Sequence, residues 1–174
     1  MPTMVRSTQD DEHLLLTLLN STPMEAGAVT DLLADSTYTR ALARDLGGEG
    51  TEAEVRELRR IREPLQASTI DGAPHPDLDL ALAQVVQRPL PLSADGLRWE
   101  LEGPIEKLVA ARVVIAWAQV TLTEPRRLRP CGNDECRLFL IDHSKSNTAR
   151  WCSMAVCGNR MKARRHHARQ RPPS

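Results

Sequence analysis

Four cysteines in the last third of the chain constrain its fold more than any other feature. They form two pairs with four residues inside each pair, and fifteen residues separate the pairs. Each pair can supply two thiolates from one tight turn, which is the ligand pattern of a tetrahedral zinc site. We therefore expect one zinc ion bound by Cys131, Cys136, Cys152 and Cys157. Disulfides are the alternative, but without a recognisable export signal, close cysteine pairs more often bind metal.

The charges divide unevenly along the chain. Residues 1–125 carry 20 acidic and 11 basic side chains, whereas residues 126–174 carry 3 acidic and 12 basic ones. A basic segment attached to an acidic one indicates a polyanionic partner, unless the two halves neutralise each other across an internal interface. We expect two domains, a mostly helical one at 1–125 and a zinc module at 126–174.

Capping patterns predict the first helices of the N-terminal domain. Asp35 or the residue after it can cap a helix that ends at the glycines following Leu46. Thr51 and Glu54 have the spacing of a capping box and open the next helix. Proline lacks the N–H that a helix interior requires, so Pro64 is predicted to end or kink this helix.

The second half of this domain is predicted to contain a helix, a hairpin and a longer helix. Apolar spacing indicates a helix over 77–87. The alternation in 97–102 is typical of a strand, which we expect to pair with 90–92 across a turn at 93–96. Pro104 can open the strongest core helix. The residues expected on its buried side are Ile105, Leu108, Val109, Val113, Ala116, Trp117 and Val120.

The zinc module is predicted to contain a knuckle, a hairpin and a helix, as in treble-clef zinc fingers. Both cysteine turns begin with Cys-Gly-Asn, at 131–133 and 157–159. Glycine and asparagine tolerate positive φ, so we expect these turns to direct backbone N–H groups toward the sulfurs. Residues 137–142 form a predicted strand, and Ser153 can cap the final helix. Four cysteine ligands leave no open position, which indicates a structural ion.

A helical projection of 153–170 separates an inner from an outer face. Met154, Cys157, Met161 and Ala168 share the face expected to pack on the zinc and the hairpin. On the outer face, amide and imidazole groups lie between basic side chains, an arrangement that suits a helix in a DNA groove. The predicted DNA contacts are Asn159, Arg160, Lys162, Arg164, Arg165, His166 and Arg169.

The segments 128–139 and 150–166 resemble the CGNR zinc finger family, which is named for the tetrapeptide at 157–160. An ABATE domain commonly precedes this finger, and three segments are similar to it: 14–22, 31–35 and 96–101. The resemblance implies that the four cysteines bind zinc and that the finger binds DNA. It also implies a bacterial, stress-related transcription regulator.

These observations predict a cytoplasmic DNA-binding regulator, which we expect to act as a homodimer on a symmetric site. The N-terminal domain would then sense an effector or pair the subunits. Polar residues that could line an effector pocket are Asn20, Thr22, Arg40 and Trp99. The alternative is a zinc-stabilised module that binds RNA or protein. Neither a membrane segment nor a catalytic motif is recognisable, so we expect neither a membrane protein nor an enzyme.

Overall fold

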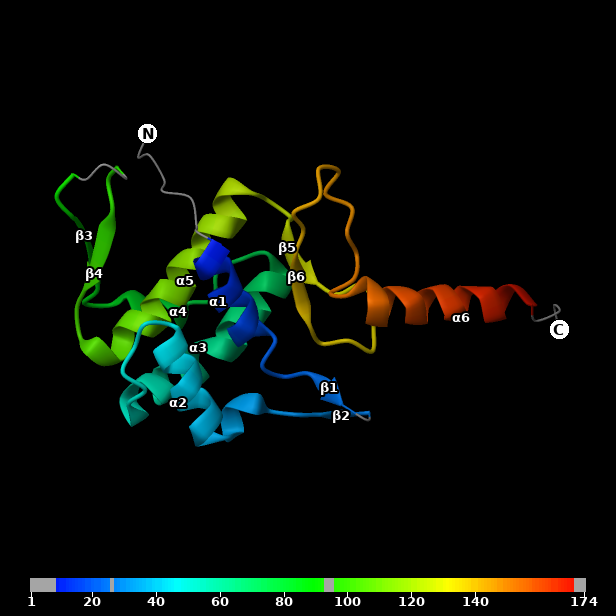
Figure 1. Ribbon diagram of the computed structural model, residues 1–174, viewed down its shortest axis with the longest axis horizontal. Coiled ribbons are helices and arrows are strands. Elements are labelled where there is room, and N and C mark those ends of the chain that lie inside the picture. The colour runs from blue at the N-terminus through cyan, green and yellow to red at the C-terminus, as the bar shows by residue number, and fades with distance from the viewer. Residues whose placement is uncertain (1–8, 26, 93–95, 171–174) are drawn as a thin grey trace.

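The computed structural model describes residues 9–25, 27–92 and 96–170, and these residues are mainly helical (Figure 1). The helices are α1 (Gln9–Leu19), α2 (Ser36–Asp45), α3 (Glu52–Asp71), α4 (Leu78–Leu82), α5 (Ile105–Thr123) and α6 (Asn159–Gln170). A 3₁₀ turn (Leu32–Ala34) and a π-helical turn (Met154–Gly158) supplement them. The strands pair antiparallel as β1 (Met24–Glu25) with β2 (Ala28–Val29), β3 (Val86–Pro89) with β4 (Trp99–Glu102), and β5 (Leu128–Pro130) with β6 (Phe139–Ile141). The prediction of a mainly α fold with small hairpins is confirmed.

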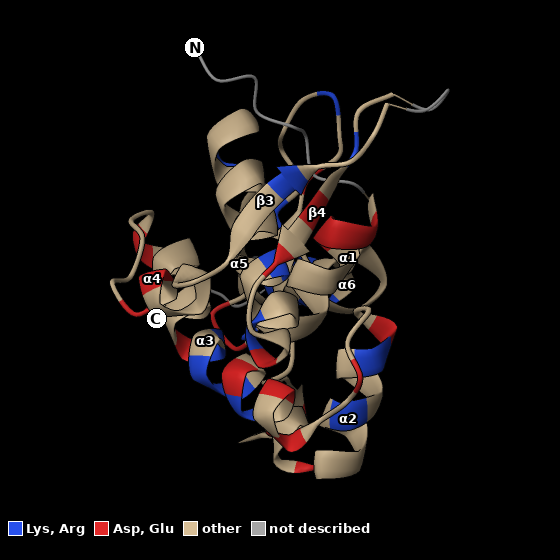
Figure 2. Ribbon diagram, turned by 90° about the vertical axis from the view of Figure 1, so that its left-hand side faces the viewer, with Lys and Arg blue, Asp and Glu red and all other residues tan. Residues whose placement is uncertain are grey.

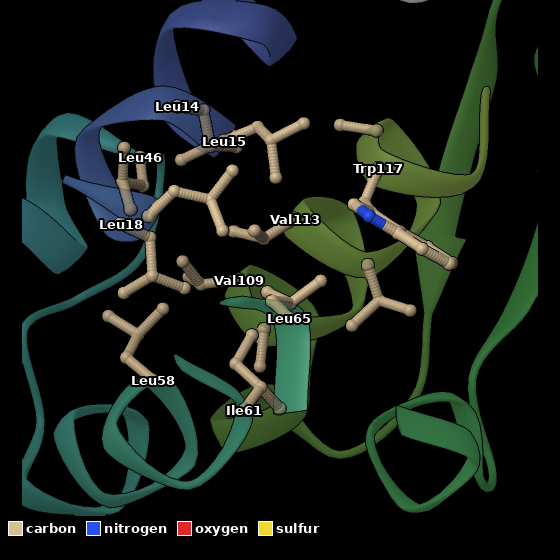
Figure 3. Close-up of a cluster of buried hydrophobic side chains, with 14 of the residues drawn as sticks. Leu14, Leu15, Leu18, Leu46, Leu58, Ile61, Leu65, Val109, Val113 and Trp117 are labelled. Carbon is tan, nitrogen blue, oxygen red and sulfur yellow. The ribbon is translucent and has the colours of Figure 1, made fainter. Parts of the chain in front are cut away.

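The hydrophobic core lies where α1, α3 and α5 pack against one another (Figure 3). Leu15 and Leu18 of α1, Leu58 and Leu65 of α3, and Val113 of α5 are fully buried. Burying one such side chain contributes about 1.5–3 kcal/mol to stability. We call the part of the protein built around these helices, residues 9–123, the body.

Both N-caps predicted for the first helices of the N-terminal domain form. The Asp35 side chain accepts hydrogen bonds from the N–H groups of Thr37 and Tyr38 at the start of α2. Thr51 and Glu54 make the reciprocal bonds of a capping box at the start of α3. These helices begin where expected because a cap depends only on residues close in sequence.

Pro64 does not end α3, contrary to one prediction, and the helix continues to Asp71. A proline inside a helix costs about 3 kcal/mol because a hydrogen bond is lost and the ring meets the preceding turn. Pro64 itself is buried, as are Ile61 and Leu65 on either side of it. Packing of α3 against α5 offsets the free-energy cost of the proline, so the helix continues past Pro64.

The predicted helix over 77–87 is too long, because α4 ends at Leu82. Gln84 has a φ of 70°, and the chain then enters β3. The hairpin forms with β4 paired to 86–89, and the predicted partner 90–92 contributes the Leu90 N–H, which donates to the Arg98 carbonyl at 2.8 Å. Part of the predicted turn, 93–95, lies outside the described residues.

Helix α5 is the main core helix, as expected, although its first turn differs from the prediction. Val109, Val113 and Val120 are buried, whereas Ile105 is 50% exposed and Leu108 is half-buried. Helical spacing identified the correct side of α5 but could not show that its first turn lies at the edge of the core.

The C-terminal part of the chain continues the core and then leaves it. Leu128, Phe139 and Ile141 of the β5–β6 hairpin belong to the hydrophobic cluster of the body. Helix α6 then projects away from the rest of the protein (Figure 1). Figure 2 views the body from the opposite end and shows acidic residues on α1, α3, α4 and β4, with basic ones among them. None of the described helices is long and apolar enough to cross a membrane.

Candidate metal centre and basic helix

The four cysteine sulfurs converge on one point. They lie within 4.8 Å of one another, and the Cys136–Cys152 and Cys152–Cys157 Sγ separations are both 3.7 Å. Zinc bound at about 2.3 Å by four thiolates at the corners of a tetrahedron sets the sulfurs about 3.8 Å apart. A disulfide needs about 2.05 Å, and all four cysteines are free. The cluster fits one structural zinc ion.

Three different local structures supply the ligands. Cys131 follows β5 directly and Cys136 precedes β6, so the first pair lies in the knuckle at the tip of the β5–β6 hairpin. A loop then leads to Cys152, and Cys157 lies in the π-helical turn before α6. Ser153 caps this turn by accepting a hydrogen bond from the Val156 N–H at 3.3 Å, as its position predicted.

Polar hydrogens from the surrounding chain point at the sulfurs, including the backbone N–H of Leu138 at Cys136. The backbone N–H of Cys152 donates to Cys131 Sγ at 3.5 Å, and the side-chain amide of Asn133 donates to Cys157 Sγ at 3.6 Å. Asn133 is completely buried, and its backbone carbonyl oxygen accepts a hydrogen bond from the Cys136 N–H at 2.7 Å. Donors of this kind reduce the repulsion among thiolates and orient them.

The two Cys-Gly-Asn triplets do not adopt the positive φ angles that we expected. Space is restricted at both glycines instead. A Cβ on Gly132 would lie 3.0 Å from the Arg150 carbonyl oxygen, and one on Gly158 would lie 3.2 Å from the Trp151 ring, whereas the exposed Met154 side chain beside it could move aside. Close chain packing is therefore a stronger reason for the glycine at 132 than for the one at 158.

The thiol pKa values show why the cluster needs a cation. Burial raises the pKa of both Cys136 and Cys152, and neighbouring cysteine sulfurs raise that of Cys152 further. Burial acts in the same direction on Cys157, but hydrogen bonds from Asn133 and the other cysteines lower its pKa overall. Four thiolates at this spacing repel one another unless a metal neutralises them, and a four-sulfur shell leaves no position for a substrate.

Asp142 holds the loop that leads from β6 to Cys152, and this role was not predicted from the sequence. This carboxylate is 2% exposed and accepts from the N–H groups of Ser144 at 2.8 Å and Ala149 at 2.7 Å. Its Oδ2 also lies 2.5 Å from Arg129 Nη2. Although burial acts in the opposite direction, the hydrogen bonds from Ser144, then that from Ala149 and the Arg129 charge, lower the pKa of Asp142 to about 2. An aspartate two residues before a serine, directly after an apolar strand, is the signal that could have indicated this turn.

Asn20 joins the finger to the body, and both polar atoms of its side-chain amide are used in doing so. Its Oδ1 accepts from the Phe139 N–H at 2.7 Å, and its Nδ2 donates to the Phe139 carbonyl at 3.3 Å. The amide thereby pairs with the outer edge of β6 as a short third strand would. This bond crosses the predicted boundary at 125/126, and so does the hydrophobic cluster.

The other residues predicted to bind an effector do not form one site with Asn20. Thr22 is buried and accepts from Gln66 Nε2 at 2.9 Å, and Arg40 forms an ion pair with Glu52. Trp99 alone lines a substantial cavity, of about 690 Å³, between the β3–β4 hairpin, α5 and the start of α1.

Helix α6 places most of the predicted DNA contacts in solvent. The exposed ones are Asn159, Arg160, Lys162, Arg164, Arg165 and His166. Arg164 pairs with Glu135 of the knuckle, and the Asn159 amide donates to the Ala155 carbonyl at 3.2 Å. The side chain of Arg169 lies outside the described residues.

The predicted inner face of this segment is only partly correct. Cys157 is buried and Met161 is half-buried, but Met154 is 68% exposed and Ala168 is also exposed. The helical projection assumed that the segment packs along its whole length. In the structure α6 leaves the finger after its first turn, so most of its length has no surface to pack against (Figure 1).

The fold and the cysteine cluster together define a zinc-binding module of the zinc finger class. Residues 127–170 match the CGNR zinc finger family. The match covers β5 to α6 and does not extend into the body. A search of curated proteins finds no match to the chain.

Proposed function

We propose that this protein is a DNA-binding transcription regulator in which structural zinc orients α6 toward a DNA duplex. One observation carries the proposal: α6 leaves the zinc cluster as a separate helix with arginine, lysine and histidine exposed around it. The sequence of α6 contains no acidic residue. A zinc finger is also compatible with nucleic-acid interaction.

The physics of an isolated basic helix supports this assignment. Twelve residues are marginal for a helix without packing. Like charges four residues apart, as in Arg160 and Arg164, destabilise a helix by about 0.2–0.5 kcal/mol per pair. The zinc-bound turn before α6 supplies the nucleus, and phosphates would remove the repulsion among the arginines. The helix therefore has the charge and shape for a polyanionic groove.

The exposed side chains of α6 divide between two tasks in this proposal. Arg160, Lys162 and Arg165 reach outward on either flank and would contact phosphates, which position the protein without reading sequence. Asn159 and His166 lie between the flanks and would approach base edges in the major groove. Since one finger covers a small site, we propose that two copies act together on a symmetric sequence.

The body would sense the signal that controls DNA binding. Its similarity in sequence to the ABATE domain suggests a sensing role in a bacterial stress response. The cavity beside Trp99 is the best candidate for an effector site, because its walls combine apolar groups such as Leu108 and Ile115 with the polar ends of Gln87 and Gln119. Its volume of about 690 Å³ lies within the range of small-molecule sites. We propose no catalytic role, and we place the protein in the cytoplasm.

The test is a salt titration of DNA binding. Zinc-loaded protein should bind a fluorescent duplex pool, with a log–log salt slope of about −0.9 per phosphate contacted. The triple variant Arg160→Ala, Lys162→Ala, Arg165→Ala should flatten this slope by about 2.7. The matched control is Arg88→Ala, which removes a positive charge from β3 at the opposite end of the molecule (Figure 1).

Three outcomes would contradict the proposal. Unchanged binding in the triple variant would mean that α6 is not the contact surface. Absence of salt-dependent binding by the zinc-loaded protein would favour the alternative, a zinc-stabilised module that docks on protein. A preference for single-stranded RNA over the duplex would favour an RNA-binding module instead, although such modules usually stack bases on exposed aromatic side chains.

A further inference from the structure

The loop that follows β6 is held at both of its ends by side-chain hydrogen bonds, chiefly those of Asp142. Asp142 receives the Ser144 N–H at one end of the loop and the Ala149 N–H at the other. Arg129 completes the anchor, since its Nη2 lies 2.5 Å from Asp142 Oδ2 and 2.9 Å from Asn147 Oδ1. Most of these polar groups form hydrogen bonds within the loop, and these bonds hold its backbone in one conformation.

The outer surface of this loop is polar and positively charged. Lys145, Ser146, Thr148 and Arg150 are all exposed. Ser146 and Thr148 share one hydrogen bond at 2.8 Å, which uses one of their two hydroxyl hydrogens and leaves the other to donate outward. The only carboxylate in 142–150 is Asp142, which is buried against Arg129. At the start of the loop His143 lies 3.2 Å from the Glu12 carboxylate of α1, whereas the cationic and hydroxyl donors from Lys145 to Arg150 suit a phosphate backbone.

Side-chain contacts connect this surface to α6. The Arg150 guanidinium lies over the Trp151 ring, 5.5 Å from its centroid. The edge of Trp151 lies against Gly158, 3.2 Å from where a Cβ would be, and α6 begins at the next residue. In Figure 1 the loop, drawn in orange, rises at the start of α6 and across the direction of the helix. Arg150 therefore connects the two basic surfaces.

We infer that the loop 143–150 is a second phosphate-binding element of the same interface, which contacts the DNA backbone beside the groove that α6 enters. This inference rests on the proposed function. A helix alone can lie in the major groove in either direction and can slide along it. A rigid donor loop at one end of the helix, directed across it, breaks this ambiguity because it can meet phosphates on one edge of the groove only. The loop would thus set the direction of α6 on the duplex.

The experiment compares two variants of the full-length, zinc-loaded protein. Lys145→Ala with Arg150→Ala should weaken binding by the same factor for every duplex sequence, since phosphate contacts carry no sequence information. Between 50 and 200 mM salt, the affinity of this variant should fall by on the order of tenfold less than that of the wild type, which corresponds to two phosphate contacts. In hydroxyl-radical footprints it should lose protection on one edge of the site only. Arg88→Ala again serves as the control for loss of a positive charge far from α6, and zinc content checks that the finger is folded.

The outcomes separate the inference from the proposed function. If the wild type and the loop variant bind with equal affinity and equal salt slope, while the α6 triple variant binds weakly, the inference is wrong and the proposed function stands. If the wild type does not bind DNA at all, both are wrong. If the loop variant loses its zinc, Lys145→Ala alone provides the test, because Lys145 is exposed and lies farther along the chain from Cys152 than Arg150 does.

Discussion

Helices α5 and α6 show two opposite ways of stabilising a helix in the same chain. Helix α5 buries residues on several sides, among them Val109, Ala111 and Val113, and its order comes from the core. Helix α6 is exposed along nearly its whole length, and its order comes from the zinc-bound turn before it. The core protects the first helix from solvent, whereas the metal presents the second to a partner. We therefore expect different substitutions to unfold the finger and the body.

Removal of a zinc ligand should have the largest effect. In Cys152→Ser we expect zinc binding to be lost and α6 to unfold, because structural zinc supplies about 10–16 kcal/mol of apparent binding free energy in comparable sites. Metal analysis should fall from one ion per chain, and the far-UV circular dichroism of the helix should decrease. The body should still unfold in one cooperative transition.

The neighbouring Ser153→Ala variant is the matched control for this loss. It removes only a cap at 3.3 Å, which costs about 1 kcal/mol, and should keep its zinc. If Cys152→Ser loses its zinc and α6 stays helical, the metal is not what holds α6, and the contrast with α5 fails.

A smaller effect should follow from separating the finger from the body. Asn20→Ala leaves the Phe139 N–H and carbonyl without their side-chain partner, which costs about 1–3 kcal/mol for buried groups. Amide hydrogen exchange at Phe139 should accelerate, with zinc content unchanged. Thr17→Ala, in the helix α1 that ends just before Asn20, should leave this exchange rate as it is. Equal rates in both variants would mean that the finger and the body are joined by apolar packing alone.

The smallest effect should be a pH dependence confined to the body. Burial acts to raise the pKa of Glu54, but hydrogen bonds from Thr51 and Glu49 outweigh it and lower the pKa below 4.5. The ionised carboxylate therefore stabilises the folded state above pH 4.5, and this contribution is lost as the pH falls through the lowered pKa. Glu54→Gln keeps one acceptor oxygen, but its NH2 group would face a backbone N–H, so at pH 7 it should cost about 1 kcal/mol.

Chemical denaturation from pH 7 down to pH 3 checks this prediction. The free energy of unfolding of the wild type should decline more steeply below pH 4.5 than that of Glu54→Gln, and the two curves should converge in acid. Parallel curves would show that the Glu54 charge does not stabilise the start of α3. Zinc release should follow the same pH profile in both proteins, since Glu54 lies in the body and not in the finger.

Local features of this protein could be predicted from the sequence. The cap at Asp35 and the capping box at Thr51 each involve residues at most a few positions apart, so they form largely independently of the rest of the chain. The zinc site could be predicted for a related reason. Its ligands are identified by residue type, and short turns fix the spacing within each pair.

Features that depend on distant segments could not be predicted in this way. Helix α3 tolerates Pro64 because Pro64 is buried and α3 packs against α5. The register between β3 and β4 depends on the turn between them, whose position the alternation of apolar residues could not give. Asn20 had the composition of a pocket residue, yet it binds Phe139, 119 positions away. Met154 had the spacing of a buried residue, yet no other element covers it enough to bury it.

By itself the sequence determined the zinc ligands, the caps and the basic character of the last helix, because these depend on residue type and short spacing. The tertiary structure alone decided that α6 projects, that Asn20 joins the finger to the body, and that Asp142 holds a rigid loop beside α6. The physical reason is that exposure and long-range pairing depend on which surfaces meet in space. A helical projection gives the direction of each side chain but cannot say whether anything lies there to pack against.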